Sequence, residues 1–241
     1  MNTLHNFIFN VYPYICLAVF FMGSLARFDR DQYTWKSDSS QLLRKSGMNW
    51  ASNLFHGGIL FLFFGHLFGQ LTPHGLYEIF VTASQKQLIA VVAGGVAGGL
   101  CFIGLTMLLH RRLFDPRIRL TSHRTDIAIL IILWVQLVIG LSTLPASLHH
   151  VSDPQTMLRL AEYLQGIVLM QPNAALVAGI EWHFQAHMLL GMTIFLLFPF
   201  SRLVHVWSGL ATVTYLFRPY QLVRARRLNV PVGHDLPRGA G

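Results

Sequence analysis

Charge is what this sequence has least of. Only 12% of its 241 residues are charged, and ten of them are acidic, whereas an ordinary soluble domain has about 25% charged residues. Hydrophobic side chains make up 53%, above the usual value of roughly 45–50%. The composition argues strongly against a water-soluble globule. The net charge of +8 then favours basic loops of a membrane protein over a nucleic-acid surface.

Cysteine is also scarce. Cys16 and Cys101 are the two in the chain, and each lies in a long apolar stretch. No pair of cysteines outside these stretches suggests a disulfide framework or a thiolate metal site. We therefore expect both thiols to serve as small packing groups.

Long uncharged stretches are what the sequence has instead. Each holds the about 20 apolar residues that cross a bilayer, and they are continuous rather than alternating, which disfavours a β-barrel. The sequence predicts an all-α integral membrane bundle of five transmembrane helices, near residues 4–26, 49–71, 88–110, 127–148 and 182–205. No basic residue precedes the first stretch, so we expect a retained helix rather than a signal peptide.

The basic residues predict the orientation. Of the 18 lysines and arginines, all but Lys86 and Arg159 lie after the first helix, after the third helix, or in the last residues of the fifth helix and beyond it. Basic loops stay in the cytoplasm, so the N-terminus is expected outside, in the periplasm, and the C-terminus inside. Residues 1–225 then form the membrane domain. The Pro- and Gly-containing residues 226–241 read as a cytoplasmic tail, disordered or ordered by a partner.

The longest connection, residues 149–181, lies on the outer side. Within it, apolar residues recur at helical spacing, at Met157, Leu160, Ala161, Leu164 and Val168. We expect a short amphipathic helix on the outer surface.

Histidines are nearly the only ionisable groups in the predicted spans. Seven of the twelve lie at helix ends, in loops or in the tail, where a solvated imidazole is the common explanation. Five lie in or near the spans: His56, His66, His183, His187 and His205. Ionisable groups inside a membrane point to function, although a hydrogen bond to a neighbouring helix is the simpler alternative.

The helix directions predict how these histidines pair. His56 lies in the cytoplasmic half of its helix and His66 about 15 Å further out. The fifth helix runs the opposite way, so His66 is level with His187 and His56 with His205. Two facing imidazoles at each of two depths are the arrangement that holds two six-coordinate haems.

One length does not fit straight helices. His187 and His205 are 18 residues apart, which is about 27 Å of helix against about 15 Å on the other side. Helix tilt, inclined haem planes and a bend at Pro199 together can absorb the difference. His183, one turn before His187, is a competing outer ligand, and spacing alone does not choose between them.

Glycines surround the histidines. They are Gly57, Gly58, Gly65, Gly69 and Gly191. They would let flat macrocycles approach the backbone, but ordinary small-residue helix packing explains them equally well.

Several longer motifs resemble the gamma subunit of membrane-bound respiratory nitrate reductase. They are Ala51–Gly57 with Gly65 and His66, Phe114–Arg117, His187–Thr193, Phe198–His205 and Tyr220–Arg226. The resemblance covers about residues 4 to 227, and the outer loop and the last residues match least.

The resemblance implies a five-helix dihaem cytochrome b in a bacterial inner membrane. His66 and His187 would bind the outer (distal) haem b, and His56 and His205 the inner (proximal) haem b, which makes His183 the weaker candidate. The family oxidises a quinol near the outer face, with Lys86, Gly65 and His66 in the quinol pocket, and releases protons outside. Electrons pass inward through both haems.

The implied partners lie on the cytoplasmic side. They are a beta subunit with iron–sulfur clusters and an alpha subunit with the molybdenum cofactor, where nitrate is reduced in anaerobic respiration. The chain itself would contact membrane quinol and lipid but no nucleic acid. Lys86 has a simpler explanation, a lysine reaching for the outer interface, and without the resemblance that explanation is preferred.

Three alternatives remain. A related dihaem cytochrome could serve another quinone-linked reductase, such as a heterodisulfide-reductase-like complex, although the match at Tyr220–Arg226 favours nitrate reductase. A haem-free transporter could use the histidines as a proton relay, and a structural anchor would need no haem. Bound haem, seen as a b-type absorption band, separates the cytochromes from the other two.

Overall fold

The computed structural model describes residues 2–36, 40, 43 and 47–209. The chain divides into two compact units, Met1–His205 and Val206–Gly241. Of the second unit only residues 206–209 are described, and they are helical. The predicted tail, its boundary at residue 225 and the motif Tyr220–Arg226 therefore lie outside the described residues.

The first unit is all helical in its described part. Five helices are long and apolar enough to cross a membrane: Thr3–Arg30, Met48–Leu71, Ala83–Phe114, Arg124–His149 and Trp182–Phe200. No strand occurs among the described residues. The predicted all-α fold with five apolar spans is confirmed, whereas the side on which each end lies stays a prediction.

These spans and their connections are built from the following elements. The first span joins α1 (Thr3–Asn6), a π-helical turn η1 (Phe7–Val11) and α2 (Tyr12–Arg30). The next three are α3 (Met48–Leu71), α5 (Ala83–Phe114) and α7 (Arg124–His149). The fifth is α9 (Trp182–Leu197) with the 3₁₀ turn η4 (Phe198–Phe200). Shorter elements are η2 (Gln32–Thr34), α4 (His74–Tyr77), α6 (Pro116–Leu120), α8 (Gln155–Val168), η3 (Ala174–Leu176) and η5 (Arg202–Val204).

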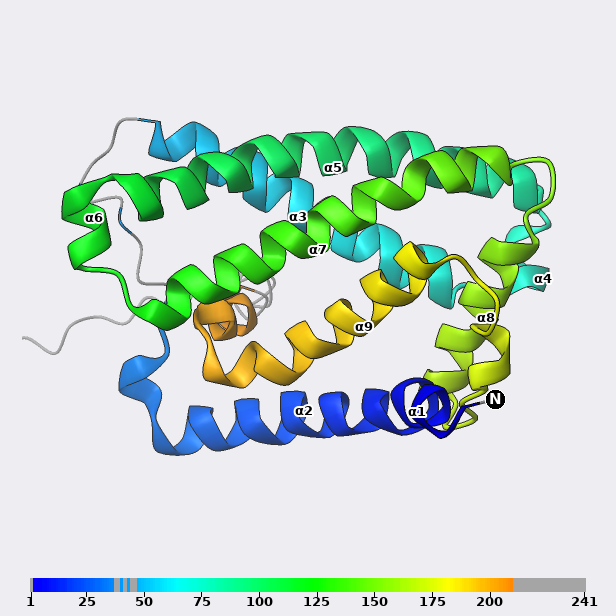
Figure 1. Cartoon of the computed structure of the whole chain (residues 1–241), viewed down its shortest axis with the longest axis horizontal. Helices are drawn as coiled ribbons and strands as arrows, with labels where there is room; N and C mark the ends of the chain where they lie inside the picture. Colours follow the sequence, from blue (N-terminus) through cyan, green and yellow to red (C-terminus); the bar gives the residue numbers. More distant parts are fainter. Residues whose placement is uncertain (1, 37–39, 41–42, 44–46, 210–241) are drawn as a thin grey trace, which may run out of the picture. The chain divides into compact units, whose positions relative to one another are not determined.

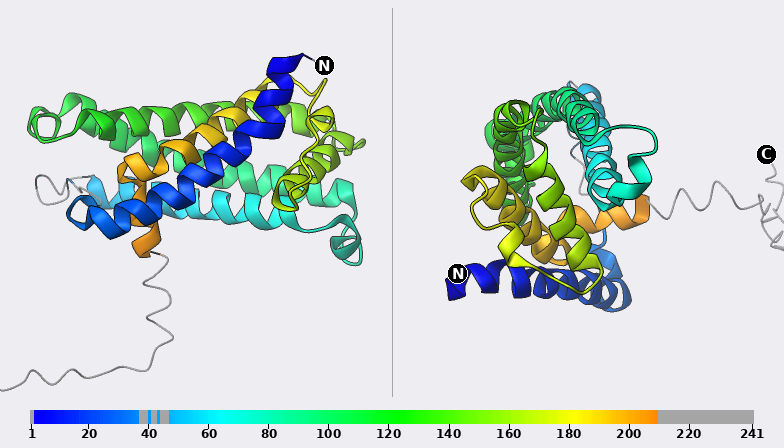
Figure 2. Two further views of the ribbon diagram at one scale, coloured as in Figure 1. Left: turned by 90° about the horizontal axis from the view of Figure 1, so that it is seen from below. Right: turned by 90° about the vertical axis from the view of Figure 1, so that its right-hand side faces the viewer.

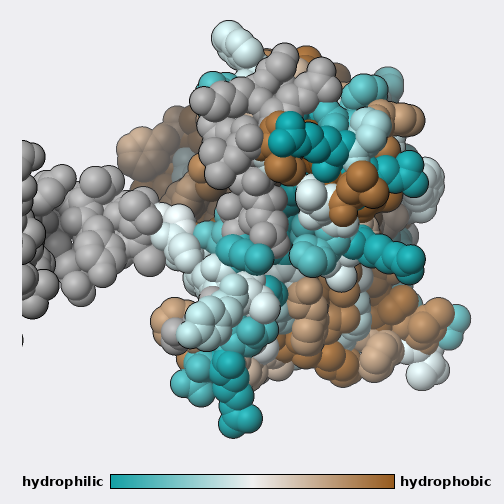
Figure 3. Space-filling view, turned by 90° about the vertical axis from the view of Figure 1, so that its left-hand side faces the viewer, coloured by the Kyte–Doolittle hydropathy of each residue, from teal (hydrophilic) through white to brown (hydrophobic). Residues whose placement is uncertain are grey.

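The long helices pack in the order α3, α5, α7, α9 and α2 (Figures 1 and 2). α3 and α9 are not neighbours in this order, yet they carry the histidines that the sequence singles out. α1, α4 and α8 gather at one end of this unit, which we call the α8 end. The opposite end, called the α6 end, carries the connection between α5 and α7, and hydrophilic side chains gather there (Figure 3).

Glycine lets α3 and α5 approach closely. A Cβ atom added to Gly58 would lie 2.6 Å from the Cβ atom of Cys101, and one added to Gly104 would meet the backbone nitrogen of Phe55. Both helices therefore need glycine at these positions. Cys101 is fully buried in this contact, as expected of a packing thiol.

The predicted amphipathic helix in the long connection is α8. Leu160, Ala161, Tyr163 and Ile167 form its buried face, but Val168 is exposed at its C-terminus, so its expected place on the apolar face was wrong. The Tyr163 hydroxyl donates a 2.7 Å hydrogen bond to the Phe9 carbonyl oxygen.

Proline explains why that carbonyl oxygen is available. Pro13 has no N–H to donate to the carbonyl four residues earlier, which is that of Phe9. The helix opens there into the π-helical turn η1. The first span is thus fastened to α8 through a group that its own helix does not use.

α5 is longer than expected at both ends. At the start, Thr82 and Gln85 form a reciprocal capping box, which stabilises a helix start five residues before the predicted one. At the α6 end, Arg112 donates a 2.7 Å hydrogen bond to Ser122 and lies 3.7 Å from the Asp126 carboxylate. This buried ion pair fastens α5 to α7.

Candidate functional site

Two histidine pairs bridge α3 and the last segment of this unit. The ring centroids of His66 and His187 are 6.1 Å apart, and those of His56 and His205 are 6.4 Å apart. His66 and His187 lie toward the α8 end, and the other pair lies toward the α6 end. The structure thus brings together the partners that the helix directions suggest, and their role as ligands stays a prediction.

The separations suit a metal ion between the two rings. An ion midway between two imidazoles, with metal–nitrogen bonds of about 2 Å, separates the ring centroids by about 6 Å. Among the described residues, no group of three or more histidine, cysteine or acidic side chains could hold a metal ion. Each pair has two imidazoles, the number of ligands that the iron of a six-coordinate haem takes from the protein.

Hydrogen bonds determine which nitrogen of each imidazole ring is free to bind a metal. In all four histidines Nδ1 contacts a backbone carbonyl oxygen, so Nδ1 carries the proton and Nε2 is left to bind a metal. The carbonyls belong to Ser52, Leu62, Gln136 and Arg202, at 2.8, 2.7, 3.2 and 2.5 Å from His56, His66, His187 and His205 respectively. His56 and His66 are exposed on α3. Inside a membrane, no side chain among the described residues therefore fully shields their polar imidazoles from the lipid.

The fifth span does not continue as one helix to residue 205, which corrects the predicted range 182–205. α9 ends at Leu197, and two 3₁₀ turns follow, separated by Ser201 in an extended conformation (φ −121°, ψ 175°). Pro199 lies in the first turn, at the bend that the sequence suggests. The change of direction at Ser201 brings His205 to His56, although His205 follows His187 by 18 positions.

A side chain of α2 holds this break. Arg27 donates hydrogen bonds to the carbonyl oxygens of Pro199 and Ser201 at 2.7 and 2.8 Å. One turn earlier, a Cβ atom on Gly23 would lie 2.8 Å from Cγ of Pro199. Arg27 therefore satisfies carbonyls that the interrupted helix leaves open, and Gly23 makes room for the proline ring.

His187, the histidine of α9 that faces His66, is held from α7. The Gln136 amide nitrogen donates a 3.0 Å hydrogen bond to the His187 carbonyl oxygen and lies 3.4 Å from Nε2 of the same residue. We assign the amide to the carbonyl, because that contact is shorter. A Cβ atom on Gly140 would lie 2.7 Å from Cε1 of His187, so only glycine fits beside the ring.

A cavity of about 460 Å³ lies next to the His66–His187 pair. Gly65, Gly69 and Lys86 line it together with both histidines. It is formed by α3, α5, α7, α8 and α9, and its wall is mainly apolar. A flat, mostly apolar ligand suits such a wall.

The glycines near the histidines differ in their surroundings. A Cβ atom on Gly57, Gly65 or Gly69 would meet nothing within 4 Å, so helix packing does not explain these three. Gly58 packs on α5, and a Cβ atom on Gly191 would lie 3.2 Å from the Gln136 amide nitrogen. Close approach of a ligand therefore suits the first three, and helix packing suits the other two.

Lys86 does not reach for the surface. Its Nζ atom is buried, has no hydrogen-bond partner among the described residues and lies 3.6 Å from the centroid of the Tyr77 ring. A lysine that extends to the membrane interface would expose this atom. Here the ammonium group keeps its hydrogen-bond donors available beside the cavity, and the aromatic ring stabilises its charge.

His183 lies among other rings. Its ring centroid is 5.1 Å from that of Trp182 and 5.8 Å from that of Phe184. His187, one turn later, is the residue whose ring faces His66.

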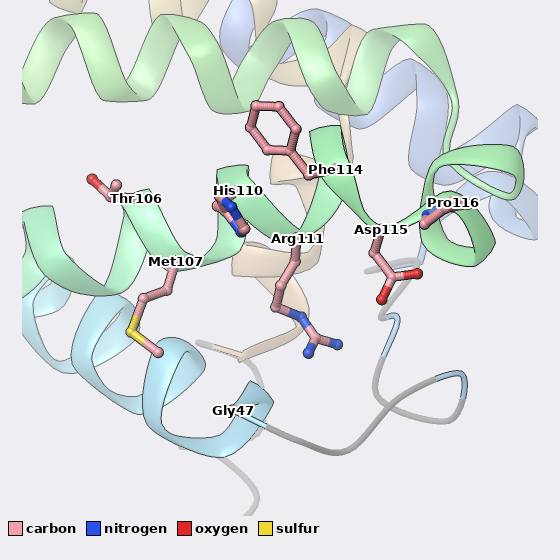
Figure 4. Close-up of a pocket in the computed structure, with 8 residues that line it drawn as sticks. All are labelled: Gly47, Thr106, Met107, His110, Arg111, Phe114, Asp115 and Pro116. Atoms are coloured by element: carbon pink, nitrogen blue, oxygen red, sulfur yellow. The ribbon is translucent and has the colours of Figure 1, made fainter.

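A second cavity, of about 490 Å³, lies at the α6 end. Thr106, Met107, His110, Arg111 and Phe114 of α5 line it with Gly47, Asp115 and Pro116 (Figure 4). None of the predicted site residues lines it.

Comparison with known proteins decides the family. The family model for the nitrate reductase gamma subunit matches residues 5–226. The chain is 51% identical to the respiratory nitrate reductase 1 gamma chain of Escherichia coli, over 94% of this chain and all of the relative. It is 35% identical to the nitrate reductase gamma chain of Bacillus subtilis, over 91% of this chain and 97% of the relative. The chain belongs to the nitrate reductase gamma subunit family.

As a member of this family, the chain is a multi-pass membrane component of an oxidoreductase, respiratory nitrate reductase. The sequence reasoning missed the residues that hold the backbone near His205 and His187, which are Arg27 and Gln136 respectively. Gln136 carried a signal, because an amide in an otherwise apolar span marks a helix contact. Arg27 carried none, since it reads as one of many basic residues after the first helix.

Proposed function

We propose that this gamma subunit oxidises a membrane quinol and passes the electrons toward partner subunits. His66 with His187, and His56 with His205, would each hold one haem b. When bound, haem b held by two histidines would supply outer-sphere electron transfer and would bind no substrate at its iron. The other tasks in this proposal belong to side chains of the chain.

The geometry of the histidine pairs carries this proposal. Both centroid separations suit an ion between the rings, and every Nδ1 atom is occupied by a carbonyl. A proton relay needs imidazoles that accept at one nitrogen and donate from the other. Here Nδ1 is already engaged within the protein in all four rings, which argues against the transporter alternative.

The quinol would bind beside the outer haem, in the part of the 460 Å³ cavity that Lys86 and Gly65 line. Lys86 would donate a hydrogen bond to a quinol oxygen from its buried ammonium group, and Gly65 leaves the α3 backbone open for the ring. His66 lines the same cavity, which places the substrate beside the first pair. Apolar walls exclude water from the reacting ring.

The expected orientation gives the reaction a direction. The α6 end, where the basic residues gather, would face the cytoplasm, and the α8 end with the cavity would face the periplasm. Protons would then leave outside and electrons inside. The iron–sulfur beta subunit and the molybdenum alpha subunit would dock at the α6 end of the chain.

A purified complex tests the proposal. We expect a b-type band in the reduced-minus-oxidised spectrum, co-purifying partner subunits, and reduction of the haems by quinol. His66→Ala should abolish the outer haem and quinol oxidation, while nitrate reduction by an artificial donor that reaches the partner subunits directly persists. His183→Ala is the matched control, one turn from His187 in α9, and should keep both haems.

Two results would contradict the proposal. A colourless complex would support the histidine relay or the structural anchor. Both haems and normal quinol turnover in His66→Ala would refute the assignment of the ligands.

A further inference from the structure

An imidazole and a carboxylate meet at the α8 end of the cavity. His150, the C-cap residue that follows α7, lines the cavity together with His66 and Lys86. Its Nε2 atom lies 2.9 Å from Oε1 of Glu181. The two side chains are 41% and 37% exposed, so the pair reaches from the cavity wall to the outside of the protein.

The hydrogen bond fixes which nitrogen of His150 can accept a proton. A neutral imidazole has one N–H group, and the carboxylate of Glu181 only accepts, so Nε2 carries the proton. Nδ1 is then the basic nitrogen. On protonation the ring becomes an imidazolium already paired with a carboxylate, a charge-assisted hydrogen bond that stabilises the new charge.

Both backbone positions favour these charge states. Glu181 precedes α9 as its N-cap, and the hydrogen bond from its own backbone together with that from His150 lowers the pKa of its carboxyl group. His150 caps the C-terminus of α7, where the helix dipole favours a positive charge. The carboxylate is thus ionised and the imidazole can take up a proton.

Other titratable groups line the cavity or act on the pair. Lys86 from α5 and His66 from α3 line the same cavity, as does His187 from α9. His183 adds a smaller favourable charge at Glu181. α8 contributes only uncharged residues to the cavity wall, namely Thr156, Met157, Leu160 and Leu164. Lys86 is the one lysine or arginine among the described residues that line the cavity.

Resting on the proposed function, we propose that His150 is the proton acceptor of quinol oxidation and that Glu181 positions and stabilises it. Each quinol hydroxyl loses its proton to Nδ1 of His150, and the two electrons lost with these protons would be taken up by the haem groups that the two histidine pairs would hold. The product is a quinone. His150 passes each proton to water at the α8 end and returns to its neutral form.

The test compares three variants in the intact complex. His150→Gln and Glu181→Gln remove the acceptor and its partner, and His149→Gln changes the neighbouring exposed histidine, which does not line the cavity. The rate of haem reduction by reduced menadione is measured from pH 5 to 9 in H₂O and D₂O. The haem spectrum and the affinity for a quinol-analogue inhibitor are measured alongside.

We expect His150→Gln to slow haem reduction about 100-fold, the lower range for a positioned general base, and to remove the acidic limb of the pH profile. Glu181→Gln should slow it about tenfold and move that limb to lower pH, because the imidazolium loses its carboxylate. Glu181→Asp should restore part of the rate. A purely structural pair would not move the pH limb or the solvent isotope effect.

Rates and pH profiles of His150→Gln and Glu181→Gln equal to those of His149→Gln would overturn the proposal. If His150→Gln fails to assemble, the pH limb of Glu181→Gln decides alone. An unaltered complex that quinol does not reduce would instead refute the proposed function.

Discussion

The two histidine pairs reach nearly the same separation by different means. His66 meets His187 from an intact helix, whereas His56 meets His205 only because the last span breaks after Leu197. In each case the chain from α9 to His205, which we call the α9 segment, is held from a neighbouring helix. One polar side chain and one glycine, four residues apart on that helix, make the contact. The pair at the α8 end relies on Gln136 and Gly140 of α7, and the pair at the α6 end on Gly23 and Arg27 of α2.

This difference teaches that backbone carbonyls of the α9 segment set the histidine positions. Gln136 binds the carbonyl of the histidine itself, while Arg27 binds carbonyls four and six positions before His205. The pair at the α6 end therefore depends on how a loop is fastened. The pair at the α8 end depends on helix packing, and the two should fail independently.

The largest expected effect is on the α8-end pair alone. Gly140→Leu places side-chain atoms where the His187 ring lies, since even a Cβ atom would come within 2.7 Å of it. We expect loss of the outer haem with the inner haem retained, read as half the haem content per complex. Gly99→Leu is the control, because a Cβ atom there meets nothing within 4 Å. Loss of both haems in Gly140→Leu would show that the pairs are coupled.

The next effect is on the α6-end pair. Arg27→Met leaves the carbonyls of Pro199 and Ser201 without their donor, at about 1.5–3 kcal/mol for each hydrogen bond to a charged group. We expect weaker retention of the inner haem and an altered electron paramagnetic resonance signal from it, with the outer signal unchanged. Arg30→Met, one turn on in α2, controls for the lost charge. An unchanged inner signal would contradict the role of Arg27.

A smaller effect is expected from Gln136→Leu. The 3.0 Å hydrogen bond to the His187 carbonyl oxygen is lost, at about 1 kcal/mol, but the ring still packs against Gly140. Both haems should remain, and the midpoint potential and spectrum of the outer one should shift. Redox titration checks this. A shift in the midpoint potential of the inner haem instead would contradict the link between Gln136 and the His66–His187 pair.

The smallest expected effect is on the stability of the chain at acid pH. The pKa of Glu181 is lowered by its own backbone hydrogen bond and by that from His150. A lowered carboxyl pKa contributes stability that is present above the ordinary value and is lost as the pH falls through the folded value. Both side chains are more than a third exposed, so solvent screening limits the contribution to less than about 1 kcal/mol. Thermal unfolding between pH 3 and 7 should show a slightly flatter pH dependence for Glu181→Gln than for the unaltered chain.

Much of the fold follows from the sequence, because membrane spans depend on length and charge alone. The five stretches and α8 were predicted, with errors at the ends of α5, where a capping box adds residues at the start, and at Val168, the exposed last residue of α8. The break after Leu197 was only suggested by Pro199, since the turn at Ser201 needs Arg27 from 174 positions away. His150 and Glu181 are 31 residues apart, and no local pattern connects them. Long-range contacts of this kind are what single-sequence reasoning misses.

The position of α2 has a consequence for the order of assembly. α2 belongs to the first span to be synthesised, yet among the described helices it packs mainly on α9, the last. The Tyr163 hydroxyl that uses the free Phe9 carbonyl also arrives 154 residues later. α3, α5 and α7 can associate in the order in which they emerge from the ribosome, while the first span waits in the lipid for the fifth. A nascent chain stopped before residue 182 would therefore leave its oldest helix without its main partner.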